Sequence, residues 1–390
     1  MISLTSDESA RRILVLQEYL ERAGIDCALI FHNVDRYYYS GTLQDGVLMV
    51  HVSHDPVLFI RRTLSRAREE AAVENVVGFQ SLREVWDFIQ DYGLPCRQVG
   101  MDMDVVPAKV YLGLTEIFSE TAFIDIAGFI RRQRAVKSRF ELSLMEEAGR
   151  RFDHVLESMR DEMHPDMSEY QAYMRFAGLL LNHQSSLLIR TRMFNMEAET
   201  RYILSGCNAS KLSATDSPTA AGTGITRAFP SGAGMKKLMA GEPILIDSVF
   251  VHEGYLVDCT RIYAFGELDP IYTSAHDVSR LCHDHFKSRV RHGTYVPDLY
   301  RMIAGIVEKK GLVDVFMGGV RFIGHGVGLE LDEFPVIAER FDDVLEEGMT
   351  IAFEPKFVFP GGTVGFENTY RILDQGVESL NRVDEAIQFL

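Results

Sequence analysis

The sequence of 390 residues is 46% hydrophobic and 25% charged, the proportions of an ordinary soluble globular protein. Its formal net charge of −16 disfavours nucleic acid and membrane surfaces as partners, because a negative surface repels phosphate groups. Five scattered cysteines indicate reduced thiols rather than a disulfide framework. The polar N-terminus does not resemble a signal peptide, and no uncharged run approaches the roughly 18 residues that span a bilayer. We therefore expect a cytoplasmic protein.

The length predicts two domains, because a single hydrophobic core rarely grows beyond roughly 250–300 residues. The first third alternates helices with short apolar strands, which indicates a small α/β domain. Its predicted elements are a helix that begins after Thr5 and ends at Gly24, strands over 27–31, 46–52 and 57–60, a helix near 67–72, and further alternation to about residue 126. We place the two domains at 1–130 and 131–390, in a chain of α/β (α+β) class.

The second domain is predicted to begin with helices that follow two capping boxes. These are Ser138-x-x-Glu141 and Ser168-x-x-Gln171, in which the serine side chain and the acidic or amide side chain each cap a backbone N–H. Short strands are predicted over 187–189 and 202–204. The stretch 205–234 is rich in Gly, Ser, Thr, Ala and Pro, and a loop of that length inside a compact domain indicates a functional role.

A hairpin with two acidic residues is predicted between Ile244 and Phe265, with its tight turn at His252-Glu253. If opposed residue numbers sum to 505, Asp247 lies directly opposite Asp258 on one face of the hairpin. Like charges in such a pair are destabilising unless a cation lies between them.

A second hairpin near the C-terminus repeats this arrangement around the turn signal Pro360-Gly361-Gly362. An even loop makes opposed residue numbers sum to 721, so that Glu354 faces Glu367. Each of the two predicted hairpins places two acidic residues opposite each other within apolar strands. This repeated pattern indicates bound cations.

His325 is the fifth candidate ligand, and the glycines on both sides of it are expected to let the backbone fold tightly and free the imidazole. Four carboxylates and one imidazole suit Mn, Fe, Co or Zn, and their charges would balance two divalent ions. A lone Asp in a strand or a lone His between glycines is more often structural. The joint pattern, however, favours a dinuclear metal site.

The segments IDSVFVHEGYLVDCTR, GHGVGLELDEFP and GMTIAFEPKF with GFENTYRI resemble the metal-binding signatures of the pita-bread (creatinase-fold) metallopeptidases. The order Asp, Asp, His, Glu, Glu and the spacing from Asp247 to Asp258 agree with that family. RRILVLQEYLERAGIDCALIFHNVDRYYYSG and RAVKSRFELSLMEEA resemble the N-terminal domain and junction of its prolidase and creatinase branch. Methionine aminopeptidases lack that domain, so the resemblance favours the Xaa-Pro dipeptidase and Xaa-Pro aminopeptidase branch.

The resemblance implies metal-dependent removal of an N-terminal residue from small Xaa-Pro peptides by a hydroxide held between two divalent ions. Asp247 would bind one ion, His325 and Glu354 would bind the other, and Asp258 and Glu367 would bridge them. Glu354 would also accept the proton of the attacking water and pass it to the departing amine. The resemblance further implies a homodimer, in which the N-terminal domain of one subunit shapes the active site of the other.

Two further active-site histidines that prolidase-like enzymes usually carry are absent from this sequence. Asp332 stands seven residues after His325 in place of one of them, and the stretch around Pro230 does not contain the other. Asp332 is a candidate to bind a cationic or amine-bearing group of the substrate, but it could instead be protonated or only cap its loop. Val336 replaces a basic residue that would hold a substrate carboxylate, which weakens the case for a strict dipeptidase.

Two rival functions are left open by the sequence. The first is a metal-dependent enzyme on the same fold that acts on another small molecule, as a C–N hydrolase or a lyase. The second is a binding module that has lost catalysis, which the presence of all five candidate ligands disfavours. A peptide or other small-molecule substrate is the expected partner.

Overall fold

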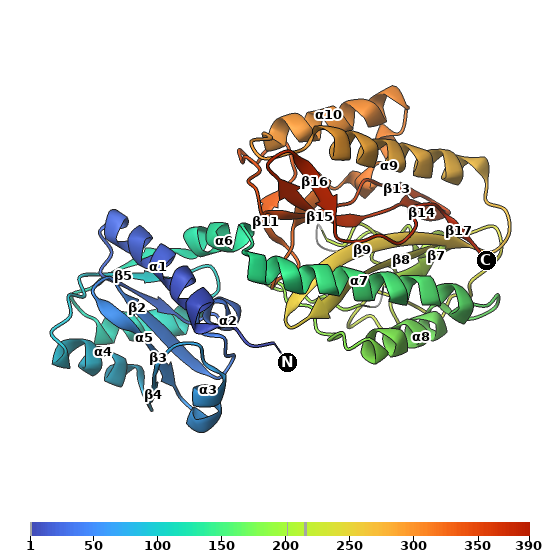
Figure 1. Ribbon diagram of the computed structural model, residues 1–390. Coiled ribbons are helices and arrows are strands. Elements are labelled where there is room, and N and C mark those ends of the chain that lie inside the picture. The colour runs from blue at the N-terminus through green and yellow to red at the C-terminus, as the bar shows by residue number, and fades with distance from the viewer. Residues whose placement is uncertain (1, 201, 214–216) are drawn as a thin grey trace. The chain divides into compact units, whose positions relative to one another are not determined.

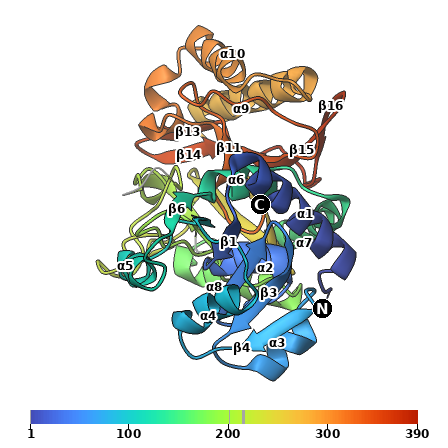
Figure 2. The ribbon, with the colours of Figure 1, turned by 90° about the vertical axis from the view of Figure 1, so that its left-hand side faces the viewer.

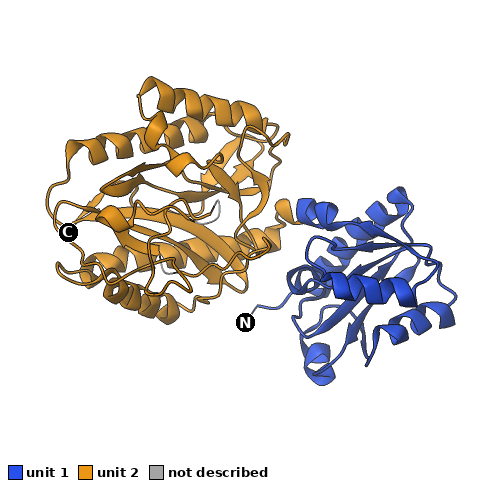
Figure 3. Ribbon diagram, turned by 180° about the vertical axis from the view of Figure 1, so that it is seen from behind, with its two compact units in different colours: residues 1–133 blue, residues 134–390 orange. Residues whose placement is uncertain are grey.

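The computed structural model describes residues 2–200, 202–213 and 217–390, so residues 214–216 of the predicted functional loop lie outside the described part. The chain divides into two compact units, Met1–Gln133 and Arg134–Leu390 (Figure 3). The division falls close to the expected boundary between residues 130 and 131. Each unit has its own sheets and its own hydrophobic core.

The N-terminal unit is built on a six-stranded mixed sheet with the strand order β4-β3-β2-β1-β5-β6 (Figure 1). Helices connect most of its strands. Its elements are α1 (Ser6–Ala23), β1 (Cys27–Ile30), α2 (Asn33–Ser40), β2 (Gly46–His51), β3 (His54–Ile60), α3 (Leu64–Glu70), β4 (Asn75–Gly78), α4 (Leu82–Asp91), β5 (Gln98–Met101), α5 (Ala108–Ile117), β6 (Ala122–Asp125) and most of α6 (Ala127–Ala135), which extends past Gln133.

Local signals in the sequence account for these elements. The hydroxyl of Thr5 accepts a hydrogen bond from the backbone N–H of Glu8 at the start of α1, and Gly24 ends the helix with φ of 69°. Alternate side chains of β1, such as Leu29, pack in one buried cluster with Ile89 of α4 and Leu114 of α5. The predicted α/β character of this region is confirmed.

The C-terminal unit contains three sheets, with strand orders β17-β9-β8-β7, β11-β10-β12-β15-β16 and β13-β14. Its helices are α7 (Arg139–Glu162), α8 (Glu169–Asn182), α9 (Pro270–Arg289) and α10 (Val296–Lys309), with short 3-10 turns at Gly206–Asn208, Val313–Val315 and Met317–Gly319. Its strands are β7 (Tyr202–Ser205), β8 (Pro243–His252), β9 (Tyr255–Ala264), β10 (Gly324–Gly326), β11 (Glu333–Val336), β12 (Thr350–Phe353), β13 (Lys356–Phe359), β14 (Gly362–Gly365), β15 (Asn368–Leu373), β16 (Gly376–Ser379) and β17 (Gln388–Phe389).

The helices of this unit cover the sheets from two sides. α9 and α10 lie over β13 to β16, and α7 and α8 lie against the sheet of β7, β8 and β9, as two perpendicular views show (Figures 1 and 2). The strands of the two predicted hairpins are therefore enclosed between helices, and almost all of their side chains are buried. Acidic residues in such strands are withdrawn from water, which favours partners of positive charge.

Both predicted capping boxes are present, and each starts a helix of the C-terminal unit. Ser138 and Glu141 cap the start of α7, and Ser168 and Gln171 cap the start of α8. The predicted strand over 187–189 is wrong, because its only pairing among the described residues is an isolated bridge from Leu188. None of the helices in the described ranges combines the length and the apolar character that a membrane span requires.

Candidate metal centre

Asp247 and Asp258 come from the hairpin of β8 and β9, in a register that differs from the predicted one. The turn is Glu253-Gly254, with φ of 49° and 89°, so opposed residue numbers sum to 507 and Asp247 lies opposite Thr260. The prediction that Asp247 directly faces Asp258 is therefore wrong. Gly254 belongs to the turn because a two-residue type I′ turn needs positive φ at both positions. The register moves by an even number, so the two aspartates still share one face.

Glu354 and Glu367 lie where the second hairpin is interrupted. β12 pairs with β15 and β13 pairs with β14, and in both ladders opposed residue numbers sum to 721, which confirms the predicted register. The two glutamates occupy the gap between these ladders. Glu367 there exchanges backbone hydrogen bonds with Thr260 of β9. The bridge brings the second hairpin beside the first, so that Asp247, Thr260 and Glu367 follow one another across three chain segments.

His325 lies at the centre of β10, between β11 and β12. The neighbouring glycines serve strand packing rather than a tight turn: a Cβ at Gly324 would collide with the carbonyl oxygen of Ala352, and one at Gly326 with that of Phe334. The expected role of these glycines is thus corrected. They let three strands approach closely, and this approach fixes the imidazole in a buried position.

The structure brings the five predicted residues together: two come from β8 and β9, one from β10, and two from the gap between the ladders of the second hairpin. Ligand atoms of Asp258, His325 and Glu367 lie within 4.8 Å of one another. Oε1 of Glu354 lies 3.7 Å from Nε2 of His325, and Asp247 adjoins the cluster through the shared contacts described below. All five side chains are buried.

The buried cluster has the donors that a divalent cation needs. Oε1 of Glu367 is buried and accepts no hydrogen bond within the described residues, whereas its Oε2 accepts one of 2.8 Å from Thr260. Burial, together with the charges of Glu367 and Asp247, raises the pKa of Asp258 well above its ordinary value. A cation would relieve this repulsion, and carboxylate oxygens with an imidazole nitrogen suit a divalent transition metal. The residues therefore fit a bound metal ion.

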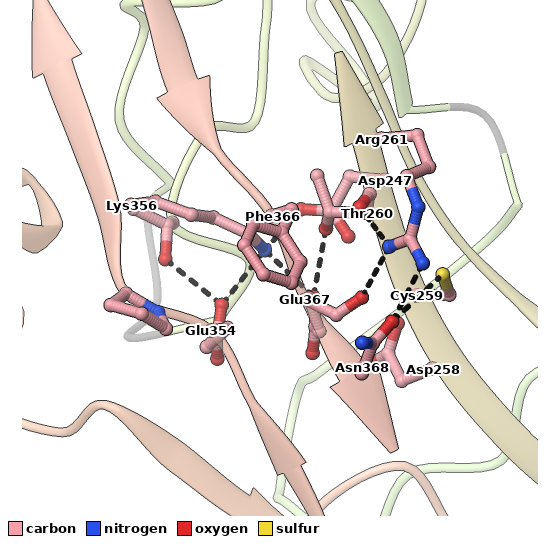
Figure 4. Close-up of polar contacts among 12 residues, drawn as sticks. Asp247, Asp258, Cys259, Thr260, Arg261, Glu354, Lys356, Phe366, Glu367 and Asn368 are labelled. Carbon is pink, nitrogen blue, oxygen red and sulfur yellow. Dashed lines mark hydrogen bonds and ion pairs between the residues drawn. The ribbon is translucent and has the colours of Figure 1, made fainter. Parts of the chain in front are cut away.

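Lys356 is a member of this cluster that the sequence analysis missed. Its Nζ donates hydrogen bonds of 2.8 Å to Asp247, 2.8 Å to Glu354 and 2.9 Å to Glu367 (Figure 4). Burial disfavours its charge, but the three carboxylates outweigh burial and raise the pKa of Lys356 well above its ordinary value. The sequence feature that could have revealed this role is a lysine within an apolar strand, two residues after Glu354.

Arg261 is a second buried cation that the sequence analysis did not identify. Its guanidinium donates to the backbone oxygens of Thr260 and Glu367, each at 2.8 Å, and to the side chain of Asn368 at 2.7 Å (Figure 4). These bonds join β9 to the segment that carries Glu367. Arg261 therefore joins the two hairpins next to the carboxylate of Glu367.

Asp332 lies on the other side of the imidazole. Its Oδ1 is 3.6 Å from Nδ1 of His325, which also lies 3.1 Å from the carbonyl oxygen of Gly326. A carboxylate in that place can fix the ring so that Nε2 points toward Asp258 and Glu354. Asp332 is not among the residues that line the cleft beside the cluster.

The loop that carries Asp332 is held by a buried ion network. Glu333 contacts Arg134 and Lys137, the latter at 3.0 Å, and accepts backbone hydrogen bonds from Leu329 and Glu330. Burial opposes the charge of Glu333, but Arg134 and Lys137 outweigh it and lower its pKa to about 2. This network fixes the segment that approaches His325.

A cleft opens beside the carboxylates. All five candidate ligands and three consecutive residues of β8 line it, and its wall is largely apolar. The apolar lining side chains are Ile189, Met196, Ala198, Tyr202, Pro218, Val249 and Leu331. A small molecule with an apolar group could therefore reach the cluster.

Comparison with known proteins identifies both parts of the chain. Residues 143–374 match metallopeptidase family M24, and residues 12–136 match the creatinase/prolidase N-terminal domain. The chain belongs to metallopeptidase family M24. The expected family, fold class and enzyme class are thereby confirmed. Membership of M24 indicates peptide hydrolysis with a divalent metal, and it does not favour a C–N hydrolase or lyase.

Similar proteins match almost the whole chain at low sequence identity. An uncharacterized peptidase of Bacillus subtilis is 24% identical, over 96% of this chain and 99% of its own length. A Xaa-Pro dipeptidase of Pyrococcus furiosus is 23% identical, over the same shares of the two chains. The solved structure of a Xaa-Pro dipeptidase from Bacillus anthracis has a TM-score of 0.84 at 20% identity, and the match covers 98% of this chain and 100% of that one. These comparisons confirm the two-part M24 fold.

Proposed function

We propose that this M24 protein removes the N-terminal residue from Xaa-Pro-type peptides by metal-dependent hydrolysis. The observation that carries the proposal is the convergence of Asp258, His325 and Glu367 within 4.8 Å, beside a cleft with an apolar wall. Relatives named Xaa-Pro dipeptidase support the substrate class. The absence of a basic residue at Val336 favours cleavage of peptides longer than two residues.

The proposed ligands are Asp247, Asp258, His325, Glu354 and Glu367. A divalent ion on these residues would lower the pKa of a bound water towards about 7 and polarise the scissile carbonyl. Glu354 is the proposed general base, because Oε1 faces His325 while Oε2 is held by Lys356. The ion is proposed to be Mn, Co, Fe or Zn. The sequence predicts two ions, but Lys356 occupies part of the space that the second ion would need.

The lining of the cleft also bears on substrate length. Lys356 is the one lysine or arginine among the described residues that line the cleft. Three carboxylates already bind its ammonium. A dipeptide would present its terminal carboxylate close to the scissile bond, where no available cation lines the described cleft. Longer peptides keep that carboxylate farther away. This arrangement favours an aminopeptidase over a strict dipeptidase.

Metal reconstitution tests the proposed function. The purified protein is stripped with a chelator, restored singly with Mn, Co, Fe or Zn, and assayed on Xaa-Pro dipeptides, Xaa-Pro tripeptides and matched peptides with Ala in place of Pro. We expect metal-dependent release of the N-terminal residue, fastest from the Xaa-Pro tripeptides. Bound metal without cleavage of any peptide would refute peptide hydrolysis, whereas equal rates on the Ala peptides would refute only the Xaa-Pro preference.

Asp332 has two proposed roles that a single variant separates. Substrate binding is the role expected from the sequence, and positioning of His325 is the role that the 3.6 Å approach to Nδ1 supports. We expect Asp332→Asn to weaken metal affinity about 10-fold, as loss of a carboxylate behind a ligating histidine does, with little change of KM at saturating metal. Metal titration and steady-state kinetics measure the two effects. A raised KM with unaltered metal affinity would assign Asp332 to the substrate. Asp298→Asn on the exposed face of α10 is the matched control.

We also propose that the protein acts in the cytoplasm as a homodimer, with 1–130 as its N-terminal domain and 131–390 as its catalytic domain. The family resemblance supports the dimer, and five free cysteines support a reducing compartment. Light scattering is expected to give twice the mass of the chain.

A further inference from the structure

We propose that the ammonium of Lys356 takes the place of one of the two metal ions, so that each chain binds a single divalent ion on Asp258, His325, Glu354 and Glu367. This inference rests on the proposed metal-dependent function. It concerns the number of ions and the residue that replaces one of them.

Distances at Lys356 leave no room for an ion on its side of the cluster. Nζ lies 2.8 Å from Oδ2 of Asp247, 2.8 Å from Oε2 of Glu354 and 2.9 Å from Oε2 of Glu367. A transition metal bound to these oxygens would lie at about 2.0–2.2 Å from them. An ion in their midst would overlap the nitrogen, so ammonium and ion exclude each other there.

The backbone directs Lys356 into this position. Lys356 is the first residue of β13, where it pairs with Gly365, and only 1% of its side chain is exposed. A second ion could enter only if the ammonium left these carboxylates. Moving a buried ammonium away from all of its anionic partners is strongly unfavourable, because the interior solvates charge poorly. Lys356 is therefore a built-in cation of the cluster.

The remaining donors form a complete site for one ion. Glu354 and Glu367 each give Oε2 to Lys356, which leaves Oε1 of Glu354 at 3.7 Å from Nε2 of His325 and Oε1 of Glu367 without a hydrogen bond in the described chain. Oδ2 of Asp258 lies 3.9 Å from the same Nε2. Asp258, His325 and Glu367 place ligand atoms within 4.8 Å of one another, and Glu354 lies beside His325. Together they offer three carboxylates and one imidazole, a sufficient ligand set for one divalent ion.

Asp247 differs from the other carboxylates in this arrangement. Its Oδ2 binds Lys356, and it lies outside the group of Asp258, His325 and Glu367. Glu354 also lies outside that group, but its Oε1 is 3.7 Å from Nε2 of His325. The residue that the family resemblance assigns to one of the two ions is therefore paired with the lysine. Asp247 is expected to affect metal affinity less than Asp258 does.

The test is a count of bound ions in wild type and in a variant without the ammonium. Stripped protein is loaded with excess Mn²⁺ or Co²⁺, freed of unbound metal by gel filtration and analysed by elemental mass spectrometry. We expect one ion per chain for the wild type and two for Lys356→Gly, which opens the space beside Asp247. Lys310→Gly, at the exposed end of α10, is the matched control and should bind one.

Spectroscopy gives a readout that does not depend on activity. The Mn²⁺-loaded wild type is expected to show the hyperfine pattern of isolated Mn²⁺, and Lys356→Gly the spectrum of two coupled ions. Two ions in the wild type would overturn the inference, as would a folded Lys356→Gly that binds only one. If that variant fails to fold, the wild-type count remains decisive. One bound ion without peptide cleavage would refute the proposed function alone, and two ions with cleavage would refute this inference alone.

Discussion

Glu354→Gln is expected to lower kcat by about 10³-fold, within the range that a positioned general base contributes. The substitution keeps the shape of the side chain and removes its negative charge. In the folded chain, Oε2 of Glu354 accepts hydrogen bonds from Lys356 at 2.8 Å and from Thr219 at 3.4 Å, and Oε1 faces His325. An amide at this place cannot accept the proton of a water molecule, so the loss should appear in kcat.

The measurement is steady-state hydrolysis of the best Xaa-Pro peptide at saturating metal. Saturation separates loss of the base from weaker metal binding, because Glu354 is also a proposed ligand. Circular dichroism and a metal count establish that the variant is folded and loaded. Glu308→Gln on the exposed face of α10 is the control and should retain wild-type kcat. A folded, metal-loaded Glu354→Gln with wild-type kcat would remove Glu354 from its proposed role.

Glu333→Gln is expected to lower the free energy of unfolding by about 3 kcal/mol at neutral pH. The pKa of Glu333 is about 2 against an ordinary 4.5, because Arg134 and Lys137 outweigh its burial. The difference, 4.5 − 2 = 2.5 units, corresponds to about 3 kcal/mol at 1.36 kcal/mol per unit. This figure already contains the attraction of Arg134 and Lys137 for the carboxylate, and in the variant Arg134 keeps Glu330 as a partner at 2.8 Å.

The sign of the pH dependence follows from the lowered pKa. The carboxylate of Glu333 stabilises the fold fully above pH 4.5, and this stabilisation is lost as pH falls from 4.5 towards 2. The difference between wild type and Glu333→Gln should therefore shrink as the solution is acidified through that range. Urea unfolding followed by circular dichroism at several pH values measures it. Trp86, the single tryptophan, reports the N-terminal unit separately by its fluorescence.

Two results would contradict this account of Glu333. One is a Glu333→Gln variant as stable as the wild type at neutral pH. The other is a stability difference that stays constant on acidification, because it would show that packing rather than charge accounts for the loss. Glu308→Gln serves again as the exposed control and should change the free energy of unfolding by less than about 0.5 kcal/mol.

Local sequence signals were sufficient for the starts of α1, α7 and α8 and for one of the two hairpins. Capping at Ser138 and Ser168 depends on side chains three residues apart, and the structure has both caps. The register of the second hairpin follows from Pro360-Gly361, which allows one tight turn between apolar strands. The family and its five candidate ligands could likewise be read from spacing and order, because these properties belong to short segments.

Long-range pairing was needed for the first hairpin and for the lysine. His252-Glu253-Gly254 offers two possible two-residue turns, and the pairing of the whole β8 and β9 strands selects Glu253-Gly254. Lys356 reaches three carboxylates only because the bridge from Thr260 to Glu367 joins segments 107 residues apart in the sequence. The spacing of residues within one segment does not predict a contact between Lys356 and carboxylates on other segments. The sequence therefore determines which side chains can act as metal ligands. The position of Lys356 among them is decided only when the separate sheets pack together.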